Sequence, residues 1–287
     1  MKFEVIYKTA TSFVVEIKEN GYFSSEQEHE IYVDGSLAEK SCRNVATVFG
    51  LAPATTYEVK IKCGEALSEA FQVTTEEEYV TLNVREFGAK GDGETDDTHF
   101  IQCAINACPR GGRVYIPAGV YKIYPLFLKS DLVLEIGKDA TLSAFTDRTK
   151  FPILPGKVEC VDKEQEYLLG TWEGDPLDMF AGIITGINVE NVVITGQGTI
   201  DGCADKSNWW DNPKVKRIAW RPRMIFLNKC RNVVLHGITV QNSPSWNIHP
   251  YFSENLRFIG ISVLGPKDSP NTDGLDPESC KNVEIVG

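Results

Sequence analysis

One aspartate in this chain has the surroundings that an exposed catalytic carboxylate needs. Asp273 lies in the tetrapeptide Asn271-Thr272-Asp273-Gly274, where small polar residues and a glycine leave the acid accessible. A carboxylate in such a place can take up or deliver a proton while a bond is hydrolysed. The same residue types also form ordinary turns, and the tetrapeptide taken alone favours a turn.

A second group of candidates combines positive charge with aromatic rings. One stretch holds Trp209, Trp210, Lys214, Lys216, Arg217, Trp220, Arg221 and Arg223. Guanidinium forks match carboxylates, and flat aromatic rings stack on sugar faces. The stretch therefore predicts contacts with an anionic sugar, and the candidate substrate-binding residues are Trp210, Arg221, Arg223, Asn271 and His249. The alternatives are a solvated basic loop for the stretch and a structural role for His249.

The elements that position these residues are indicated by a repeat. The frame Asn, aliphatic, any residue, apolar, any residue, Gly occurs at 191–196, 232–237, 255–260 and 282–287, at spacings of 41, 23 and 27 residues. Apolar triplets with Gly or Asn between them continue from residue 113 onward without a helical period. This pattern predicts a parallel β-helix in which each coil contains about three short strands.

The repeat also predicts which residues are neighbours. Adjacent coils lie about 4.8 Å apart, so residues one period apart face each other. One coil before Asp273 lies the segment 246–250, which contains His249. We expect the repeated Asn side chains to stack with their amides bonded along the axis, while each Gly forms a tight bend. The long 41-residue coil carries an insertion at about 203–221, and a second insertion spans about 146–180.

Residues 1–76 have a different pattern. Short alternating segments separated by turn residues predict antiparallel strands at 3–7, 13–17, 30–33, 57–61 and 70–74. A Pro turn at Pro53 precedes Tyr57, which predicts a tyrosine corner in a β-sandwich. The segment resembles a fibronectin type III domain, with a structural spacer as its simplest role. The acidic run at 76–78 is the predicted linker to a second domain at 80–287.

An acidic cluster opens the second domain. Asp92, Glu94, Asp96 and Asp97 precede an apolar segment at 100–108 that predicts a helix. Calcium binding would need a full twelve-residue loop with a terminal bidentate Glu, which is lacking here. Capping of the helix is the simpler interpretation, and such a helix would cover one end of the coils.

Composition limits the classes of function. The chain has 287 residues, 42% of them hydrophobic and 24% charged, with a net charge of -11. This balance predicts a soluble globular protein and argues against general nucleic-acid binding, which needs a basic surface. No stretch approaches the ~18 apolar residues of a membrane span. We also expect no metal and no other cofactor.

The cysteines and the N-terminal residues bear on the compartment. The eight cysteines form no C-x-x-C pair, and residues 1–7 alternate like a strand instead of forming a secretory leader. We expect free, mostly buried thiols in a cytoplasmic protein. A translation start further upstream would instead allow a secreted or periplasmic location.

Several motifs taken together resemble one family. They are the G-D-G-E-T-D-D-T start, G-Q-G-T-I-D-G at 196–202, Trp209-Trp210, R-P-R-M-I at 221–225, N-S-P-S-W-N-I-H-P at 242–250 and S-P-N-T-D-G-L-D-P at 269–277. In this order they are similar to glycoside hydrolase family 28, the polygalacturonases, and most of all to the bacterial exo-acting type. The resemblance covers about residues 80–287.

The resemblance implies a right-handed parallel β-helix that hydrolyses α-1,4-linked galacturonate in pectin or oligogalacturonides with inversion. It implies that Asp273 helps to activate the attacking water. The family's later Asp-Asp pair, His and Arg-x-Lys have no match in these residues. Inversion requires an acid and a base on opposite sides of the bond, so we expect a C-terminally truncated chain that is inactive alone. Strand alternation predicts that the nearby Asp276 faces away from Asp273.

Two other functions remain open. A catalytically silent β-helix would bind pectin, or serve a structural role, without cleaving it. A pectate lyase-like enzyme would need calcium or a Lys or Arg base, and it would release unsaturated products.

Overall fold

The computed structural model describes residues 2–18, 23–158 and 168–287, so Cys160 lies outside the described residues. The chain divides into two compact units, one formed mainly by Met1–Val80 and the other mainly by residues 81–284. Neither unit has a described helix with the length and apolarity that a membrane span requires. The seven described cysteines carry free thiols as predicted, but only three of them are buried.

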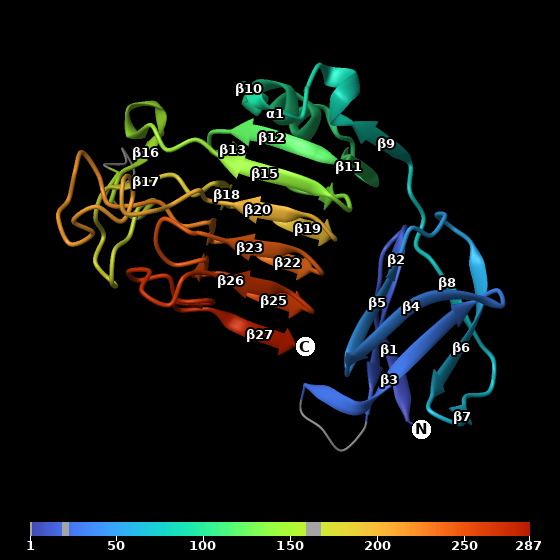
Figure 1. Ribbon diagram of the computed structural model, residues 1–287. Helices are drawn as coiled ribbons and strands as arrows, with labels where there is room; N and C mark the ends of the chain where they lie inside the picture. The colour runs from blue at the N-terminus through green and yellow to red at the C-terminus, as the bar shows by residue number, and fades with distance from the viewer. Residues whose placement is uncertain (1, 19–22, 159–167) are drawn as a thin grey trace. The chain divides into compact units, whose positions relative to one another are not determined.

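The first unit is an antiparallel sandwich (Figure 1). One sheet has the order β1 (Phe3–Lys8), β2 (Ser12–Ile17), β5 (Val45–Phe49). The other has the order β4 (Ser36–Arg43), β3 (Ser24–Val33), β6 (Thr56–Cys63), β7 (Ala66–Leu67), with β8 (Phe71–Thr74) also pairing with β6. The five predicted strands are all present, and β4, β5 and β7 are additional.

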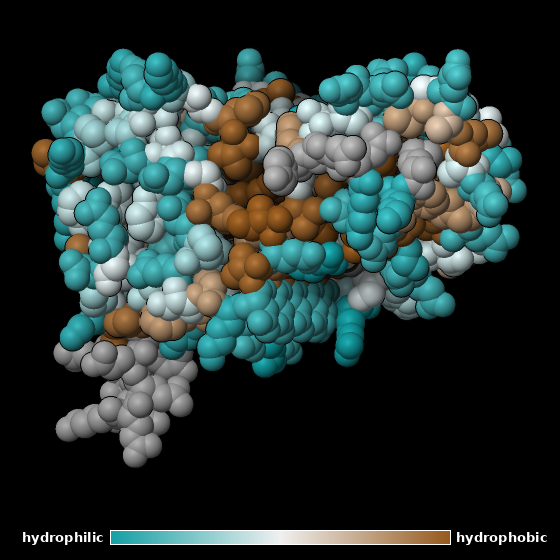
Figure 2. Space-filling model, turned by 90° about the horizontal axis from the view of Figure 1, so that it is seen from below, coloured by the Kyte–Doolittle hydropathy of each residue, from teal (hydrophilic) through white to brown (hydrophobic). Residues whose placement is uncertain are grey.

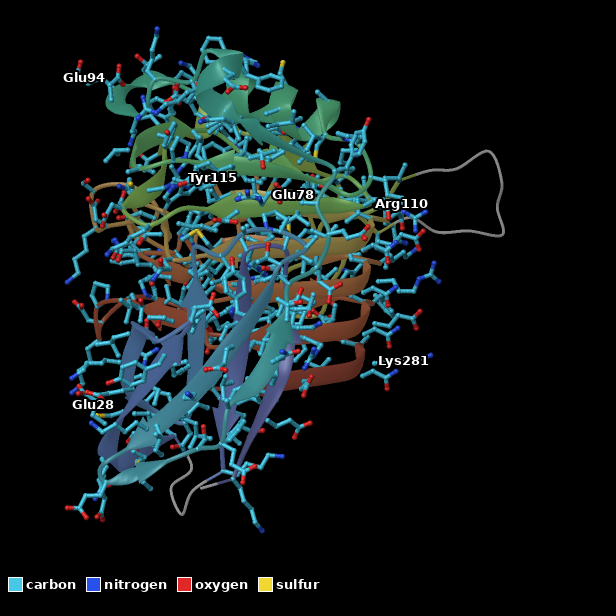
Figure 3. The ribbon with its side chains drawn as sticks, turned by 90° about the vertical axis from the view of Figure 1, so that its right-hand side faces the viewer. Glu28, Glu78, Glu94, Arg110, Tyr115 and Lys281 are labelled. Carbon is cyan, nitrogen blue, oxygen red and sulfur yellow. The ribbon has the colours of Figure 1, made fainter. Side chains whose placement is uncertain are left out.

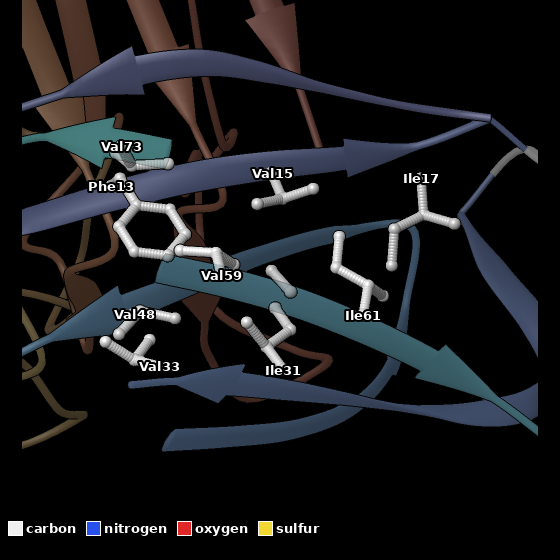
Figure 4. Close-up of a cluster of buried hydrophobic side chains, with 10 residues drawn as sticks. Phe13, Val15, Ile17, Ile31, Val33, Val48, Val59, Ile61 and Val73 are labelled. Carbon is white, nitrogen blue, oxygen red and sulfur yellow. The ribbon is translucent and has the colours of Figure 1, made fainter. Parts of the chain in front are cut away.

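The core of this unit comes from alternate residues of both sheets. Phe13, Val15 and Ile17 on β2 pack with Ile31 on β3 and Ile61 on β6 (Figure 4). Alternation places these side chains on one face of each strand, which is the pattern of a sheet with one buried face.

The tyrosine corner of the first unit is confirmed. The Tyr57 hydroxyl accepts a hydrogen bond of 2.8 Å from the backbone N–H of Ala52. This bond fixes the connection that enters β6, as the Pro turn before Tyr57 predicts.

The second unit is a parallel β-helix with three sheets, which confirms the predicted fold (Figure 1). The seven-stranded sheet has the order β27 (Lys281–Val286), β25 (Glu254–Ile259), β22 (Arg231–His236), β19 (Glu190–Gly196), β14 (Leu132–Ile136), β11 (Gly112–Ile116), β9 (Val80–Asn83). The six-stranded sheet has the order β10 (Asp92–Asp96), β12 (Gly119–Ile123), β15 (Ala140–Ala144), β20 (Thr199–Asp201), β23 (Thr239–Gln241), β26 (Ser262–Leu264).

The third sheet has four strands: β13 (Leu126–Phe127), β18 (Ile184–Ile187), β21 (Ile225–Asn228) and β24 (Ile248–Tyr251). The two predicted insertions leave the coils before β18 and before β21, and the first contains the short pair β16 (Ile153–Leu154) and β17 (Met179–Phe180). The 3-10 helices are η1 (Val84–Phe87) and η2 (Arg148–Lys150).

The predicted helix is α1 (Thr98–Ala107), but its capping differs from the prediction. Asp97 occupies the N-cap position without capping through its side chain. Its carboxylate instead accepts from the backbone N–H groups of Lys90 and Gly91, at 2.7 and 2.9 Å. Asp96 accepts from the Thr98 N–H, and Asp92 closes a turn onto Thr95. The three aspartates of the cluster therefore satisfy local backbone donors.

The repeated asparagines are joined by one continuous chain of hydrogen bonds between their side-chain amides, as predicted. Each Nδ2 donates to the Oδ1 of the Asn one coil earlier, at 2.9 to 3.0 Å, in the order Asn282, Asn255, Asn232, Asn191. Asn191 then donates to Asp131 at 2.9 Å. We call these five residues the Asn ladder. All five have φ between 52° and 57°, a left-handed backbone that Asn and Asp tolerate better than most residues.

The surface of the coils is mainly polar. Figure 3 shows the side chains of Arg110 and Lys281 at the outer edge of the coils, pointing away from them. On the face shown in Figure 2, hydrophilic residues predominate and hydrophobic ones gather in one part. The charged side chains at the turns are therefore solvated, and most apolar side chains of the inner strands alternate into the coil interior, whereas Val120, Leu264 and Ile285 are exposed.

Candidate active site

Asp273 lies beside the segment that the coil period predicts. The backbone N–H of Asn247 donates to the Asp273 carbonyl at 2.8 Å, and the Ile248 N–H donates to Gly274 at 3.2 Å. Ile248 and Tyr251 form parallel bridges to Leu275 and Glu278. Residues 273–278 thus extend the four-stranded sheet by one irregular rung. The predicted proximity of the 246–250 segment to Asp273 is confirmed.

Asp273 is exposed and lines an open hollow of about 420 Å³. Asn271 and Lys267 lie on the same hollow. The Asn271 oxygen accepts a hydrogen bond of 2.7 Å from Arg221, so this side chain is already held by the protein. The hollow therefore presents an accessible carboxylate next to an amide and an ammonium group.

Asp276 lies on the same irregular rung as Asp273 but outside the set of residues that line the hollow. Burial, and after it the charge of Asp273, raise the pKa of Asp276 to about 6, while Arg223 opposes the shift. The Oδ2 atom of Asp276 is buried and makes no hydrogen bond within the described residues. That the Asp276 side chain faces away from Asp273 stays a prediction, because alternation is a property of regular strands and this rung is irregular.

Arg223 and His249 form a buried chain of hydrogen bonds with Glu278. The Arg223 Nε donates to His249 Nδ1 at 3.2 Å, and the other ring nitrogen lies 3.1 Å from the Glu278 carboxylate. An arginine only donates, so Nδ1 must be unprotonated and Nε2 must carry the hydrogen. Burial, and after it the charge of Arg223, lower the pKa of His249 to about 3, which agrees with this neutral tautomer.

Aromatic rings enclose the two arginines. The Arg223 guanidinium lies 4.5 Å from the ring centres of both Trp172 and Trp246. Trp172 also lies 5.4 Å from Arg221 and stacks on Trp220 at 4.6 Å. Burial is the main cause that lowers the pKa of Arg223 to about 9 and that of Arg221 to about 10. Both remain cations at neutral pH, stabilised by the rings and by hydrogen bonds.

Comparison with known proteins identifies the family. The model of Glycosyl hydrolases family 28 matches residues 114–287. An endo-polygalacturonase of Pectobacterium parmentieri is 35% identical over 212 residues, which cover 69% of this chain and 49% of that protein. The chain belongs to glycosyl hydrolase family 28.

Solved structures agree with the family. An exopolygalacturonase from Thermotoga maritima is 28% identical, with a TM-score of 0.60, covering 71% of this chain and 51% of that one. The family 28 exopolygalacturonase of Yersinia enterocolitica is 22% identical, with a TM-score of 0.67 over 99% of this chain and 62% of that one. The latter supports the fold alone. This family 28 chain spans about half the length of the curated relatives it matches, or somewhat less.

The other residues that the sequence predicts to bind substrate are buried. Arg221, Arg223 and His249 are at most 3% exposed. Trp210 is 8% exposed, and its indole N–H donates to the Ser243 carbonyl at 3.0 Å. Of the predicted site residues, the structure brings Asp273 and Asn271 together at the exposed hollow. It brings the arginines and His249 together beneath it.

Sequence reasoning missed three members of this family 28 site. Glu278 and Asn247 both follow from strand register, because they lie beside Tyr251 and Gly274 on adjoining coils. Trp172 comes from the long insertion, where no repeat predicts its position. We call Arg221, Arg223, Asn247, His249 and Glu278 the polar cluster.

Proposed function

We propose that this protein is a polygalacturonase that hydrolyses α-1,4-galacturonosyl linkages of pectin or oligogalacturonides with inversion. The observation that carries the proposal is Asp273. In a chain of family 28, it is an exposed carboxylate on an open hollow, and its backbone is held by the adjoining coil. Lys267 on the same hollow supports a substrate that carries carboxylates.

In the proposed reaction, a water molecule attacks the anomeric carbon while the bond from that carbon to the leaving sugar oxygen breaks. Asp273 receives a proton from the attacking water, and the leaving oxygen takes up a proton from an acid on the other side of the bond. Removing one acid-base group typically costs 10²–10⁴ in rate. We expect Asp273→Asn to lower kcat by about a thousandfold.

We further propose that cleavage starts from a chain end. Two observations support this: the two insertions next to the four-stranded sheet, since loops over a groove can close one end of it, and the exopolygalacturonase similarity. The test is a time course of products from polygalacturonate. A single short product from the earliest times is expected. Mixed oligomers at early times would overturn the exo mode.

The assay uses the protein as it occurs in its source organism. Reducing ends are measured for the wild type, for Asp273→Asn and for the control Asp268→Asn, whose carboxylate forms an exposed ion pair with Lys206. NMR of the first product should show the inverted anomer. Binding of oligogalacturonate without new reducing ends would instead indicate a binding β-helix. Products that absorb in the ultraviolet would indicate a lyase.

A further inference from the structure

The segment that carries Asp273 has no regular secondary structure of its own. Residues 265–274 lie between β26 and the irregular rung, and Asn271 has a left-handed φ of 55°. A carboxylate on such a segment keeps its direction only if other groups hold the backbone. Catalytic geometry is sensitive to this, because a 1 Å displacement can reduce a rate by about a hundredfold.

Arg221 holds the N-terminal part of this segment. Its guanidinium donates to the carbonyls of Pro270, at 3.0 Å, and Pro244, at 2.7 Å. It also donates to the Asn271 side-chain oxygen at 2.7 Å. These acceptors lie on two different coils, so the planar fork of one arginine joins the segment to the preceding coil.

Asn247 holds the C-terminal part of the segment. Its side-chain Nδ2 donates to the carbonyls of Thr272 and Asp273, at 3.0 and 3.1 Å, and its backbone N–H also donates to Asp273. The amide orientation is fixed by these contacts, because the reverse would place oxygen against two carbonyl oxygens. Three donor bonds from one buried residue thus reach two consecutive peptide groups.

Protein covers almost the whole surface of both residues, although Asn247 also lines the hollow beside Asp273. Arg221 is 3% exposed and Asn247 is 2% exposed, and the donors named above all point at protein oxygens. Their partners lie within three residues of Asp273 or on the coil beneath it. Both side chains are therefore suited to fixing the Asp273 backbone, a role that differs from the substrate contact predicted for Arg221.

We propose that Arg221 and Asn247 are positioning residues that set the direction of the Asp273 carboxylate. The inference rests on the proposed hydrolysis, in which Asp273 receives the proton of the attacking water. Losing either side chain therefore lowers kcat and leaves substrate binding almost unchanged.

The test uses Arg221→Lys and Asn247→Leu. Lysine keeps the charge at position 221 but lacks the planar fork, and leucine keeps the volume at position 247 but lacks the donors. We expect kcat to fall ten- to a hundredfold in each variant with KM within about twofold, since the contact acts on geometry. Arg231→Lys and Asn106→Leu are matched controls, because both residues are exposed and lie away from this segment.

Amide hydrogen exchange gives a readout that does not depend on turnover. We expect faster exchange in the two variants that is confined to peptides covering residues 266–275. A raised KM with unchanged kcat, or unchanged exchange in that segment, would overturn the positioning role. Exchange that rises throughout the second unit would overturn it too, because it would indicate a general loss of structure. If the wild type does not hydrolyse polygalacturonate, the proposed function fails, and the exchange result still decides whether the segment is held as proposed.

Discussion

The Asn ladder and the polar cluster both join successive coils through side-chain hydrogen bonds, but they are built differently. In the ladder, every coil supplies a short polar side chain with the same left-handed backbone and an equivalent bond to its neighbour. In the polar cluster, each coil supplies a different residue with its own partners. The ladder is exposed and the cluster is largely buried.

The two regions therefore contribute to the stability of the protein in different ways. An exposed hydrogen bond between side-chain amides contributes only about 0.5–1.5 kcal/mol to the free energy of unfolding, because water replaces a lost partner. A buried charged group has no such replacement, and removing its partner costs several times more. Repetition therefore supports the coils generally, while the non-repeating cluster fixes particular groups next to Asp273.

The largest effect is expected for Arg223→Met. This change leaves His249 and Ser245 without a buried donor and removes the cation from between Trp172 and Trp246. We expect the free energy of unfolding to fall by about 3–5 kcal/mol, because each buried acceptor left without its donor costs about 1–3 kcal/mol and the cation–π contacts are lost as well. Urea denaturation measures it.

Arg231→Met is the matched control at the edge of the coils. Arg231 is half-exposed and pairs with Glu190 at the surface, so we expect a loss of less than about 1 kcal/mol. Equal losses at positions 223 and 231 would show that burial does not distinguish the two regions.

Acid should weaken the cluster through His249. Burial lowers the pKa of His249 from 6.5 to about 3. Below pH 6.5 the unfolded state therefore binds a proton that the folded state does not, and stability present above pH 6.5 is lost as pH falls. From pH 7.5 to pH 5 this amounts to at most about 2 kcal/mol.

The measurement compares wild type with His249→Gln by urea denaturation at both pH values. Glutamine can accept from Arg223 and donate to Glu278 without titrating. We expect the variant to lose up to about 2 kcal/mol less than the wild type on acidification. Parallel losses would mean that His249 is not the titrating group. His236 lies in the same sheet as the ladder strands, and burial lowers its pKa to about 4, so it serves as an internal comparison.

Most of the Asn ladder was predictable from the sequence. The Asn-to-Gly frame predicted the coils and the stacked amides, since identical residues at one period must meet. It missed the rung at Asp131, where aspartate replaces asparagine and Gly137 follows one residue late. The left-handed φ is the requirement that Asp and Asn share, and the frame does not show it.

The cluster was less predictable from sequence. The period placed His249 beside the Asp273 segment, and the basic stretch drew attention to Arg221 and Arg223. Their burial depends on Trp172, which comes from an insertion without any repeat. Whether an arginine faces solvent or an indole is decided by loop packing, which local residue patterns do not encode.

Within the ladder, two substitutions separate backbone from side-chain effects. Asn232→Ala removes both side-chain hydrogen bonds of Asn232 and places alanine at φ 55°. We expect the free energy of unfolding to fall by about 2 kcal/mol. Asn232→Gly removes the same bonds but accepts that backbone, and we expect about half that loss. Urea midpoints measure both. Equal losses of stability in the two variants would show that the side-chain hydrogen bonds alone account for the contribution of Asn232.

The smallest effect is expected at Asp276, next to the cluster. Burial raises the pKa of this carboxyl to about 6, with the Asp273 charge as the second cause. Between its ordinary value of 3.8 and about 6, the unfolded chain ionises while the folded chain keeps the proton. Stability therefore falls as pH rises through this window, and above about pH 6 the loss is complete. Because the group is partly solvated, we expect about 1 kcal/mol.

Asp276→Asn removes that ionisation. We expect it to stabilise the protein by about 1 kcal/mol at pH 7.5 and to have no effect at pH 4, where the folded wild type is already protonated. This direction is opposite to that of His249, whose contribution is lost in acid. Both groups contribute to the pH dependence of stability in the same pH range. Comparing Asp276→Asn with His249→Gln therefore separates the contribution of one charge from that of the other. A stabilisation of Asp276→Asn that is equal at both pH values would mean that the gain comes from packing and not from removing the ionisation of this buried carboxyl.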